Sequence, residues 1–504
     1  MNIPDLLAIQ SRKYPEHEAI VTPDERLTYR QWNRTVNQLC SSLLELGVVK
    51  GDKVVLHMPN TKEFLICYFA VQRLGGIIVP INPKLVEQEA AYIMEHSDAR
   101  MFLTHEAVFP AVSNLPDKVE GMFAKTGRHS DQWLSIDELI LEGASGEISC
   151  QLTEEDEAAL LYTSGTTGAP KGVLYTYRNI LSVAVMICIE MTMKPESRIL
   201  HMMPLSHSAP LHLFMVAGTY VGGVHVLVPN FSPELLLETV SREKTTHFFG
   251  APIAYLASAK HPGIEEYDLS SMEYWVYGGA PLSGPEVTFI KEKFSTKKLM
   301  CVYGLTEAGP NGTLLGFDDH PHKAGSIGHR AALNCEIKLV DEHGREVEQG
   351  QVGEIILKGE GNMKGYYKDL EKTAETLKDG WLYTGDMAKR DEDGYYWVVD
   401  RKKDIIISGG VNIFPKEVEQ MLLSHPAVAD VAVVGVPHPD WGETVKAYVV
   451  VAREVEDLTA ECRQFLDGKL ADYKIPRLYE ELKALPRNAT GKLLKGQLRS
   501  QPQH

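Results

Sequence analysis

The stretch Tyr162–Gly172, YTSGTTGAPKG, guides the interpretation of the whole sequence. Its three glycines let a backbone approach a bulky anion closely, and its hydroxyl side chains can donate to phosphate oxygens. Lys171 adds a mobile positive charge. The order Pro-Lys-Gly differs from the Gly-Lys-Ser/Thr of a Walker A loop. A surface turn rich in glycine and threonine is the alternative, so this stretch alone predicts a phosphate-binding loop only as a hypothesis.

The sequence before this loop alternates segments of helical pattern with short apolar runs. Such alternation favours an α/β fold in which helices cover both faces of a sheet. The expected elements are a helix over Thr28–Leu46 ended by Gly47, a strand over Lys53–His57, a helix over Glu63–Leu74, and a strand over Ile77–Val79 stopped by Pro80.

The pattern changes near residue 400, where DRKKD (Asp400–Asp404) places five charges in a row. This run is either a solvated turn or an interdomain hinge. The segments after it predict a compact α+β domain of about 100 residues. We therefore expect a large N-terminal domain, 1–400, and a small mobile C-terminal domain, 401–504. The expected C-terminal elements are helices over Lys416–Leu423 and Leu458–Leu470 and strands over Val428–Val436 and Thr444–Val451.

Composition narrows the classes of function. The 504 residues carry a net charge of −17, which disfavours nucleic acid as a partner. The seven cysteines contain no CxxC pair, which indicates buried free thiols rather than a zinc site or disulfides. The N-terminus lacks a signal-peptide pattern, and the uncharged stretch Ser208–Pro229 is interpreted as buried strand and loop rather than a membrane span. A cytoplasmic location is expected.

Further motifs follow the loop in a fixed order. They are YGGAPL (Tyr277–Leu282), YGLTEAG (Tyr303–Gly309), YTGD (Tyr383–Asp386), DRKKDIIISGG (Asp400–Gly410) and PRNATGK (Pro486–Lys492). Together with TSGTTGAPKG, this set resembles the adenylate-forming superfamily of acyl-CoA synthetases, luciferase-like enzymes and peptide-synthetase adenylation domains. The likeness covers nearly the whole chain.

The resemblance implies a nucleotide site. Adenine would lie against Gly278–Ala280, Asp386 would accept from the ribose hydroxyls, and Arg401 would donate near the same sugar. Thr306 would bond a phosphate and Glu307 would hold Mg²⁺, which needs few protein carboxylates when phosphates also bind it. The implied ATP- and AMP-binding residues are Thr163, Ser164, Gly165, Thr166, Thr167, Gly168, Lys171, Gly278, Gly279, Ala280, Tyr303, Gly304, Asp386, Val398 and Arg401.

The resemblance also implies the catalytic lysine and the moving parts. Lys492 would touch both the attacking carboxylate and the α-phosphate and offset their repulsion. The nearby Lys483 and Lys495 make a solvated basic face the alternative. The hinge would be Lys403, and Ser408, Gly409 and Gly410 would line the channel for coenzyme A. Val411 stands where some CoA synthetases have arginine, so the contacts to the CoA nucleotide stay open.

The acid is predicted from the remaining segments. His207, in PLSHSAP, falls at the family position near the carboxylate and its gate, although a core histidine is the alternative. Ile199–Asn230 contains no Asp or Glu to pair with an ammonium group, which argues against an amino acid. The apolar segment Phe248–Tyr255 suits an alkyl chain or an aromatic ring. Gly304 and Gly309 are expected to leave space that favours a chain, and hence a fatty acid.

The predicted function is therefore ATP-dependent acyl-adenylate formation with release of pyrophosphate, followed by acyl transfer to coenzyme A. The catalytic candidates are Lys492, Thr306, Glu307 and His207. Alternatives are a ligase for coumarate- or succinylbenzoate-like acids, a freestanding enzyme that loads a separate carrier protein, a luciferase-like oxygenase, and a non-catalytic nucleotide-binding module. The sequence is compatible with a homodimer.

Overall fold

A computed structural model describes residues 2–163, 170–408, 411–487 and 493–499. The described residues form two compact units. Unit 1 holds those within 1–163, 170–337 and 357–383, and unit 2 holds those within 338–356 and 384–504. The domain boundary at residue 400 stays a prediction.

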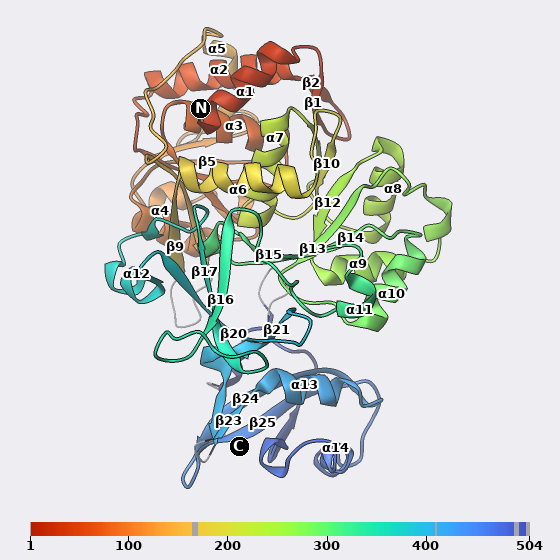
Figure 1. Cartoon of the computed structure of the whole chain (residues 1–504). Helices are drawn as coiled ribbons and strands as arrows, with labels where there is room; N and C mark the ends of the chain where they lie inside the picture. The colour runs from red at the N-terminus through yellow and green to blue at the C-terminus, as the bar shows by residue number, and fades with distance from the viewer. Residues whose placement is uncertain (1, 164–169, 409–410, 488–492, 500–504) are drawn as a thin grey trace. The chain divides into compact units, whose positions relative to one another are not determined.

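Unit 1 contains two large sheets of mainly parallel strands (Figure 1). The first has an antiparallel strand at each end, and the second has two successive antiparallel pairings at one end. The first has the order β15 (Gly312–Leu315), β14 (Leu299–Gly304), β13 (Tyr274–Gly278), β12 (His247–Gly250), β10 (Arg198–His201), β11 (Val224–Leu227), β1 (Glu18–Val21), β2 (Arg26–Thr28). The second has the order β18 (Gly365–Tyr366), β9 (Lys171–Thr176), β8 (Glu157–Thr163), β4 (Ile77–Ile81), β3 (Lys53–His57), β5 (Ala99–Thr104), β6 (Met122–Lys125), β7 (Leu134–Ser135).

Helices connect these strands. They are α1 (Ile3–Lys13), α2 (Tyr29–Glu45), α3 (Lys62–Arg73), α4 (Glu87–Ser97), α5 (Ile136–Glu142), α6 (Tyr177–Glu190), α7 (Ala217–Val221), α8 (Pro233–Glu243), α9 (Pro252–Ala259), α10 (Gly284–Lys293), α11 (His320–Lys323) and α12 (Leu370–Thr376). The predicted α/β architecture, with a large N-terminal part and a smaller C-terminal part, is confirmed.

Helix α2 shows how local sequence sets this framework. Thr28 accepts a hydrogen bond from the Gln31 amide at its N-terminus, and the Gln31 side chain accepts from the Thr28 amide. Trp32 and Val36 recur at helical spacing and are fully buried. Gly47, at φ +82°, follows the helix, as the sequence predicts. The predicted elements over Thr28–Leu46, Lys53–His57 and Glu63–Leu74 are confirmed, and every end agrees within one residue.

Two expectations for unit 1 are wrong. Strand β4 continues through Pro80 to Ile81; its pairing with β8 is at Ile78, so the missing Pro80 amide does not interrupt that ladder. The uncharged stretch Ser208–Pro229 is buried but largely helical, with a π-helix over Ala209–Val216 that runs into α7 before strand β11. Periodicity is uninformative there because every face of this helix is apolar and buried. Within the described ranges, no helix is long and apolar enough to cross a membrane.

A buried histidine pair lies beside this helix. The Thr219 hydroxyl donates to the Met215 carbonyl (2.9 Å), so it accepts from Nε2 of His225 (3.0 Å). Nδ1 of His225 is then the acceptor for Nε2 of His201 (3.0 Å). These bonds fit a neutral His225 ring that carries its proton on Nε2. Burial lowers the pKa of His225 to about 3 and that of His201 well below its ordinary value.

We expect acid to destabilise unit 1 through this pair. The unfolded chain binds protons below pH 6.5 and the folded pair does not, so the free energy of unfolding falls as pH drops from 6.5 towards the folded pKa values. The expected loss is about 2 kcal/mol for the pair between pH 6.5 and 5.5, and other buried histidines act in the same direction. Urea unfolding at the two pH values measures it. An unfolding free energy that does not change with pH would contradict this expectation.

Unit 2 contains a five-stranded sheet of order β23 (Val411–Ile413), β22 (Ile406–Ser408), β25 (Gly442–Val451), β24 (Val428–His438), with β26 (Leu478–Glu481) beside β25. Helix α13 (Pro415–Leu423) packs on β24 through Val418 and Leu422, and α14 (Leu458–Leu466) and α15 (Lys495–Arg499) complete the unit (Figure 1). A further sheet comes from residues 335–401. Its strands are β16 (Cys335–Val340), β17 (Val352–Gly359), β20 (Trp381–Arg390) and β19 (Leu377–Lys378), with β21 (Tyr396–Arg401) beside β20.

Candidate active site

The glycine-rich stretch joins two antiparallel strands of unit 1. Thr163 ends β8 and Lys171 begins β9, and the two residues face each other in the register. The side chains implied to bind phosphate between them, Ser164, Gly165, Thr166, Thr167 and Gly168, lie outside the described residues. The hairpin thus presents Thr163 and Lys171 together at the mouth of the predicted phosphate loop.

Lys171 and the predicted magnesium ligand, Glu307, both contact the side chain of Tyr366. Its ammonium group is 5.6 Å from the centroid of the Tyr366 ring, and the Tyr366 hydroxyl donates to Oε1 of Glu307 at 2.9 Å. The structure therefore brings together two motifs that are far apart in the chain, through a residue that belongs to neither. Tyr366 was missed in the sequence because no motif connects it with Glu307.

Glu307 sits in a short 3₁₀ turn over Thr306–Ala308, after strand β14. The backbone of the turn is held from two sides, since Tyr175 Oη donates to the Thr306 carbonyl and the Met363 amide donates to the Glu307 carbonyl (2.8 Å). Ser208 Oγ donates to Thr306 Oγ1 at 3.4 Å. Tyr175 and Ser208 are not predictable from the sequence either, because both contacts join residues far apart in the chain.

The turn fits a magnesium ion that also binds phosphates. Glu307 is half-buried, and its Oε2 has no hydrogen-bond or ion-pair partner within the described part of the chain. The described residues contain no group of three or more His, Cys, Asp or Glu side chains that could hold a metal by themselves. A lone carboxylate oxygen beside a phosphate loop is the kind of ligand set that Mg²⁺ completes with phosphates and water.

The predicted adenine platform follows strand β13, which runs parallel to β14 with Gly278 opposite Val302. A Cβ at Gly278 would lie 2.8 Å from the Val302 carbonyl oxygen, so only glycine fits between the strands. Gly279 has φ +82°, and a Cβ there would meet nothing within 4 Å. Gly279 and Ala280 are exposed, and Tyr303 and Gly304 end the neighbouring strand. An exposed stretch of backbone is present at Gly279 and Ala280, while adenine binding stays a prediction.

The expectation that Gly304 and Gly309 leave space in the acyl pocket is wrong. A Cβ at Gly304 would lie 2.1 Å from the Pro310 carbonyl oxygen, and one at Gly309 would lie 2.3 Å from that of Gly361. Gly309 also has φ +88°. Both glycines are required by the packing of the chain against itself. They carry no information on whether an alkyl chain or a ring is bound.

His207 lies just before the π-helix, and burial lowers the pKa of its imidazole, which is therefore neutral near pH 7. Its Nε2 atom and the Ser206 hydroxyl are buried without a hydrogen-bond partner among the described residues. Buried polar atoms without partners are uncommon, and a catalytic role or a bound water or ion can account for them. The position is compatible with the predicted carboxylate role, which stays a prediction.

The predicted ribose residues meet in unit 2. Strands β20 and β21 pair with Asp386 opposite Arg401, and Arg401 Nε contacts Asp386 Oδ1 at 2.9 Å. The Asp386 side chain is only 8 % exposed. Val398 lies opposite Ala388 on the same pair of strands and is half-buried. The structure thus brings together three of the residues that the resemblance implies for the nucleotide.

The predicted hinge residue Lys403 is exposed in a 3₁₀ turn over Lys402–Asp404. Its neighbours are tied within unit 2, Lys402 to Glu354 (2.8 Å) and Asp404 to Arg499 (2.9 Å). Of the predicted CoA channel, Ser408 ends β22, whereas Gly409 and Gly410 lie outside the described residues.

Lys492 also lies outside the described residues. Arg487 and Leu493, on either side of that segment, pair as an antiparallel bridge. Lys495 forms an ion pair with Glu419 (2.7 Å), and the two side chains are 13 % and 14 % exposed. Lys495 therefore does not belong to a solvated basic face, so that alternative is wrong for this residue. Lys483 is exposed.

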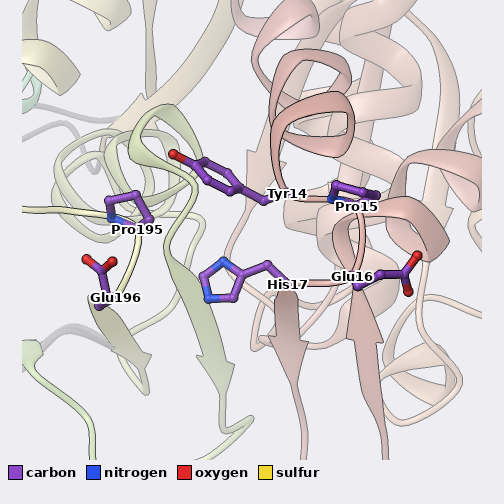
Figure 2. A pocket seen from close by; sticks show the side chains of 6 residues that line it. All are labelled: Tyr14, Pro15, Glu16, His17, Pro195 and Glu196. Carbon is purple, nitrogen blue, oxygen red and sulfur yellow. The ribbon is translucent and has the colours of Figure 1, made fainter.

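A separate hollow of ≈ 440 Å³ lies between the end of α1 and the loop before β10. It is lined by Tyr14, Pro15, Glu16, His17, Pro195 and Glu196 (Figure 2). Figure 2 shows the His17 ring directed towards the side of Pro195 and Glu196, whereas Glu16 points away and pairs with Arg30 (2.7 Å). None of the predicted site residues lines this hollow, and its acidic side chains are unsuited to phosphate.

Comparison with known proteins identifies the family. The family model "AMP-binding enzyme" matches residues 7–367, and "AMP-binding enzyme C-terminal domain" matches residues 417–492. The chain belongs to the AMP-binding enzyme family. The predicted membership of the adenylate-forming superfamily is thereby confirmed.

Relatives in the AMP-binding family are named for several acids. A long-chain-fatty-acid–CoA ligase of Bacillus subtilis is 35% identical over 526 residues, covering 98% of this chain and 93% of the relative. A feruloyl-CoA synthase of an Amycolatopsis species is 35% identical over 503 residues, covering 97% of each chain. The solved structure of o-succinylbenzoate CoA synthetase from Bacillus subtilis, with an acyl-adenylate intermediate, has a TM-score of 0.86 and 30% identity, and covers 99% of this chain and 98% of its own. This chain thus groups with CoA ligases of fatty and aromatic acids.

Proposed function

We propose that this protein is an ATP-dependent acid–CoA ligase. Its strongest structural support is the arrangement of Lys171 and Glu307 around Tyr366, beside the phosphate loop of an AMP-binding enzyme. A cation and a carboxylate with a free oxygen, both near a phosphate loop, suit a bound nucleotide triphosphate with its magnesium ion.

The proposed reaction has two steps. A carboxylate oxygen of the acid attacks the α-phosphorus of ATP, and the bond from that phosphorus to the β-phosphate oxygen breaks, so pyrophosphate leaves. The CoA sulfur then attacks the acyl carbonyl carbon; AMP leaves and the thiol proton passes to solvent. Lys492 would hold the reacting groups of the first step together, and Asp386 with Arg401 would hold the ribose. Magnesium, held by Glu307 and the phosphates, would neutralise charge on the triphosphate.

The proposed substrate is a hydrophobic carboxylic acid, with a fatty acid first. The absence of Asp and Glu between Ile199 and Asn230 supports an uncharged acyl group. Ring contacts such as Phe214 with Phe249 (centroids 5.5 Å apart) add apolar surface near these segments. An aromatic acid is the second candidate, because the feruloyl-CoA synthase is as similar in identity as the fatty-acid ligase.

A panel of acids tests this function. The purified protein is incubated with ATP, Mg²⁺ and acids from acetate to palmitate, with benzoate, coumarate, ferulate, succinylbenzoate and several amino acids, and pyrophosphate release is measured with and without CoA. We expect release with fatty acids and acyl-CoA formation once CoA is added. Release with the aromatic acids alone would replace the fatty-acid proposal. An acyl-adenylate that CoA does not consume would point to a carrier-protein thiol, and no release with any acid would contradict the function.

We further propose that Lys403 is the hinge about which the C-terminal domain rotates between the two half-reactions. Proline at this position fixes φ near −65° and removes an amide donor, so a backbone rotation there becomes restricted. Lys403→Pro should retain pyrophosphate release in the first turnover and lose about tenfold in acyl-CoA formation. Rapid-quench measurement of both steps, with Lys403→Ala as control, tests this. Equal losses in both steps would contradict the hinge role.

A further inference from the structure

We propose that Tyr366 is a positioning residue for nucleotide-bound magnesium: it orients Glu307 through its hydroxyl and keeps Lys171 from neutralising that carboxylate. This inference rests on the proposed function, because it assigns the metal and the triphosphate to this turn. It concerns a residue outside the recognised motifs, on the two-residue strand β18.

The first argument is the restraint on the carboxylate. Two contacts fix the backbone of the Thr306–Ala308 turn, one from Tyr175 and one from the Met363 amide. What remains free is the rotation of the Glu307 side chain. Among the described residues, Tyr366 is the only one whose side chain bonds this carboxylate, and it occupies Oε1 alone (2.9 Å). The bond selects one orientation and leaves Oε2 available.

The second argument is the choice of donor. The hydroxyl of Tyr366 is an uncharged donor, and it donates to Oε1 of Glu307 at 2.9 Å. A neutral donor orients a carboxylate and leaves its full negative charge for a cation. A lysine or arginine in the same place would cancel that charge and compete with Mg²⁺.

The third argument is the position of Lys171. Its ammonium group lies over the Tyr366 ring, 5.6 Å from the centroid, and within the described ranges it forms no ion pair with Glu307. The ring offers the cation a favourable site of its own. Tyr366 therefore contacts two opposite charges at once, the Glu307 carboxylate through its hydroxyl and the Lys171 ammonium through its ring, and Lys171 remains available for phosphate.

The test measures ATP binding, without any acid substrate, in the presence and absence of Mg²⁺. Titration calorimetry compares the wild type with Tyr366→Phe, which keeps the ring and removes the hydroxyl. Because a hydrogen bond to a charged group is lost, the Mg²⁺-dependent gain in ATP affinity should fall about fivefold to tenfold, with little change in Mg²⁺-free affinity. Tyr367→Phe is the matched control, because the Tyr367 hydroxyl also donates to a carboxylate, Asp98 (2.8 Å), which is exposed.

A double-mutant comparison separates orientation from simple damage. In a Glu307→Gln background, Tyr366→Phe should cause no further loss of Mg²⁺ dependence, because the carboxylate it orients is gone. The proposal is overturned if the hydroxyl deletion leaves the Mg²⁺ dependence unchanged, if affinity falls equally without Mg²⁺, or if the loss persists in the Glu307→Gln background. It is also overturned if the wild type shows no Mg²⁺-stimulated ATP binding. If the wild type binds Mg-ATP but activates no acid, the proposed function is contradicted and the proposal for Tyr366 is not.

Discussion

Lys492→Ala should lower the rate of acyl-adenylate formation by about 100- to 1,000-fold, which is the usual loss when one group that stabilises transition-state charge is removed. Two anionic groups must meet in this step, the carboxylate of the acid and the α-phosphate. An ammonium group in contact with both offsets their repulsion and aligns them for attack. The measurement is pyrophosphate release with saturating ATP and the best acid of the panel.

The second half-reaction provides the internal control. When the acyl-adenylate is supplied ready-made, the variant should form acyl-CoA at nearly the wild-type rate, because thiol attack does not require a cation at the α-phosphate. Lys483→Ala is the matched surface variant, since Lys483 is exposed in the same part of the chain. Equal loss in both half-reactions, or normal pyrophosphate release by Lys492→Ala, would remove this lysine from the mechanism.

Much of the fold was predictable because its signals are local. The cap of α2 and its buried face lie within one segment, as does the apolar core of β3. The errors arise where local signals are weak or have two meanings. The π-helix before α7 is apolar on every face, so its period cannot be read. A proline such as Pro80 usually predicts the end of a strand, yet β4 continues past it to Ile81, because the pairing of β4 with β8 is at Ile78 and does not need the Pro80 amide.

The candidate site shows the same division between local and long-range information. The structure has Thr306 and Glu307 in a short turn after β14 and Lys171 at the start of β9, each within a local motif, while the binding roles of these residues stay predictions. Tyr366 stands 59 residues from Glu307, and only the folded chain shows their contact. For Gly304 the sequence predicted space for a ligand, but the space is filled by a neighbouring carbonyl group. Glycine is the same letter in both cases, so the sequence cannot distinguish them.

Glu419→Gln should lower the free energy of unfolding of unit 2 by about 3 kcal/mol, as expected when one partner of a buried ion pair is removed. Glu419 lies on α13 and pairs with Lys495, and both are largely buried. Its carboxylate also accepts from the Val433 amide (2.7 Å), a bond that glutamine can keep. The substitution therefore removes the negative charge and leaves this hydrogen bond in place. Lys495 would be left buried without its counter-ion, close to Lys416, whose pKa burial already lowers.

Two variants define what this loss means. Glu417→Gln, two residues earlier on the same helix, removes a partly exposed pair with Lys474 and should cost less than about 1 kcal/mol. Replacing both partners, Glu419→Leu with Lys495→Met, should recover most of the stability, because no unpaired charge remains. Hydrogen exchange over 415–436 follows α13 and β24 directly. If these amides are equally protected from exchange in Glu419→Gln and in Glu417→Gln, the buried ion pair contributes no more to stability than the surface pair. If protection instead falls in Glu419→Gln and returns in the double variant, the loss of stability comes from leaving Lys495 buried without a counter-ion. In that case α15 does not need the charges of this pair to stay in place.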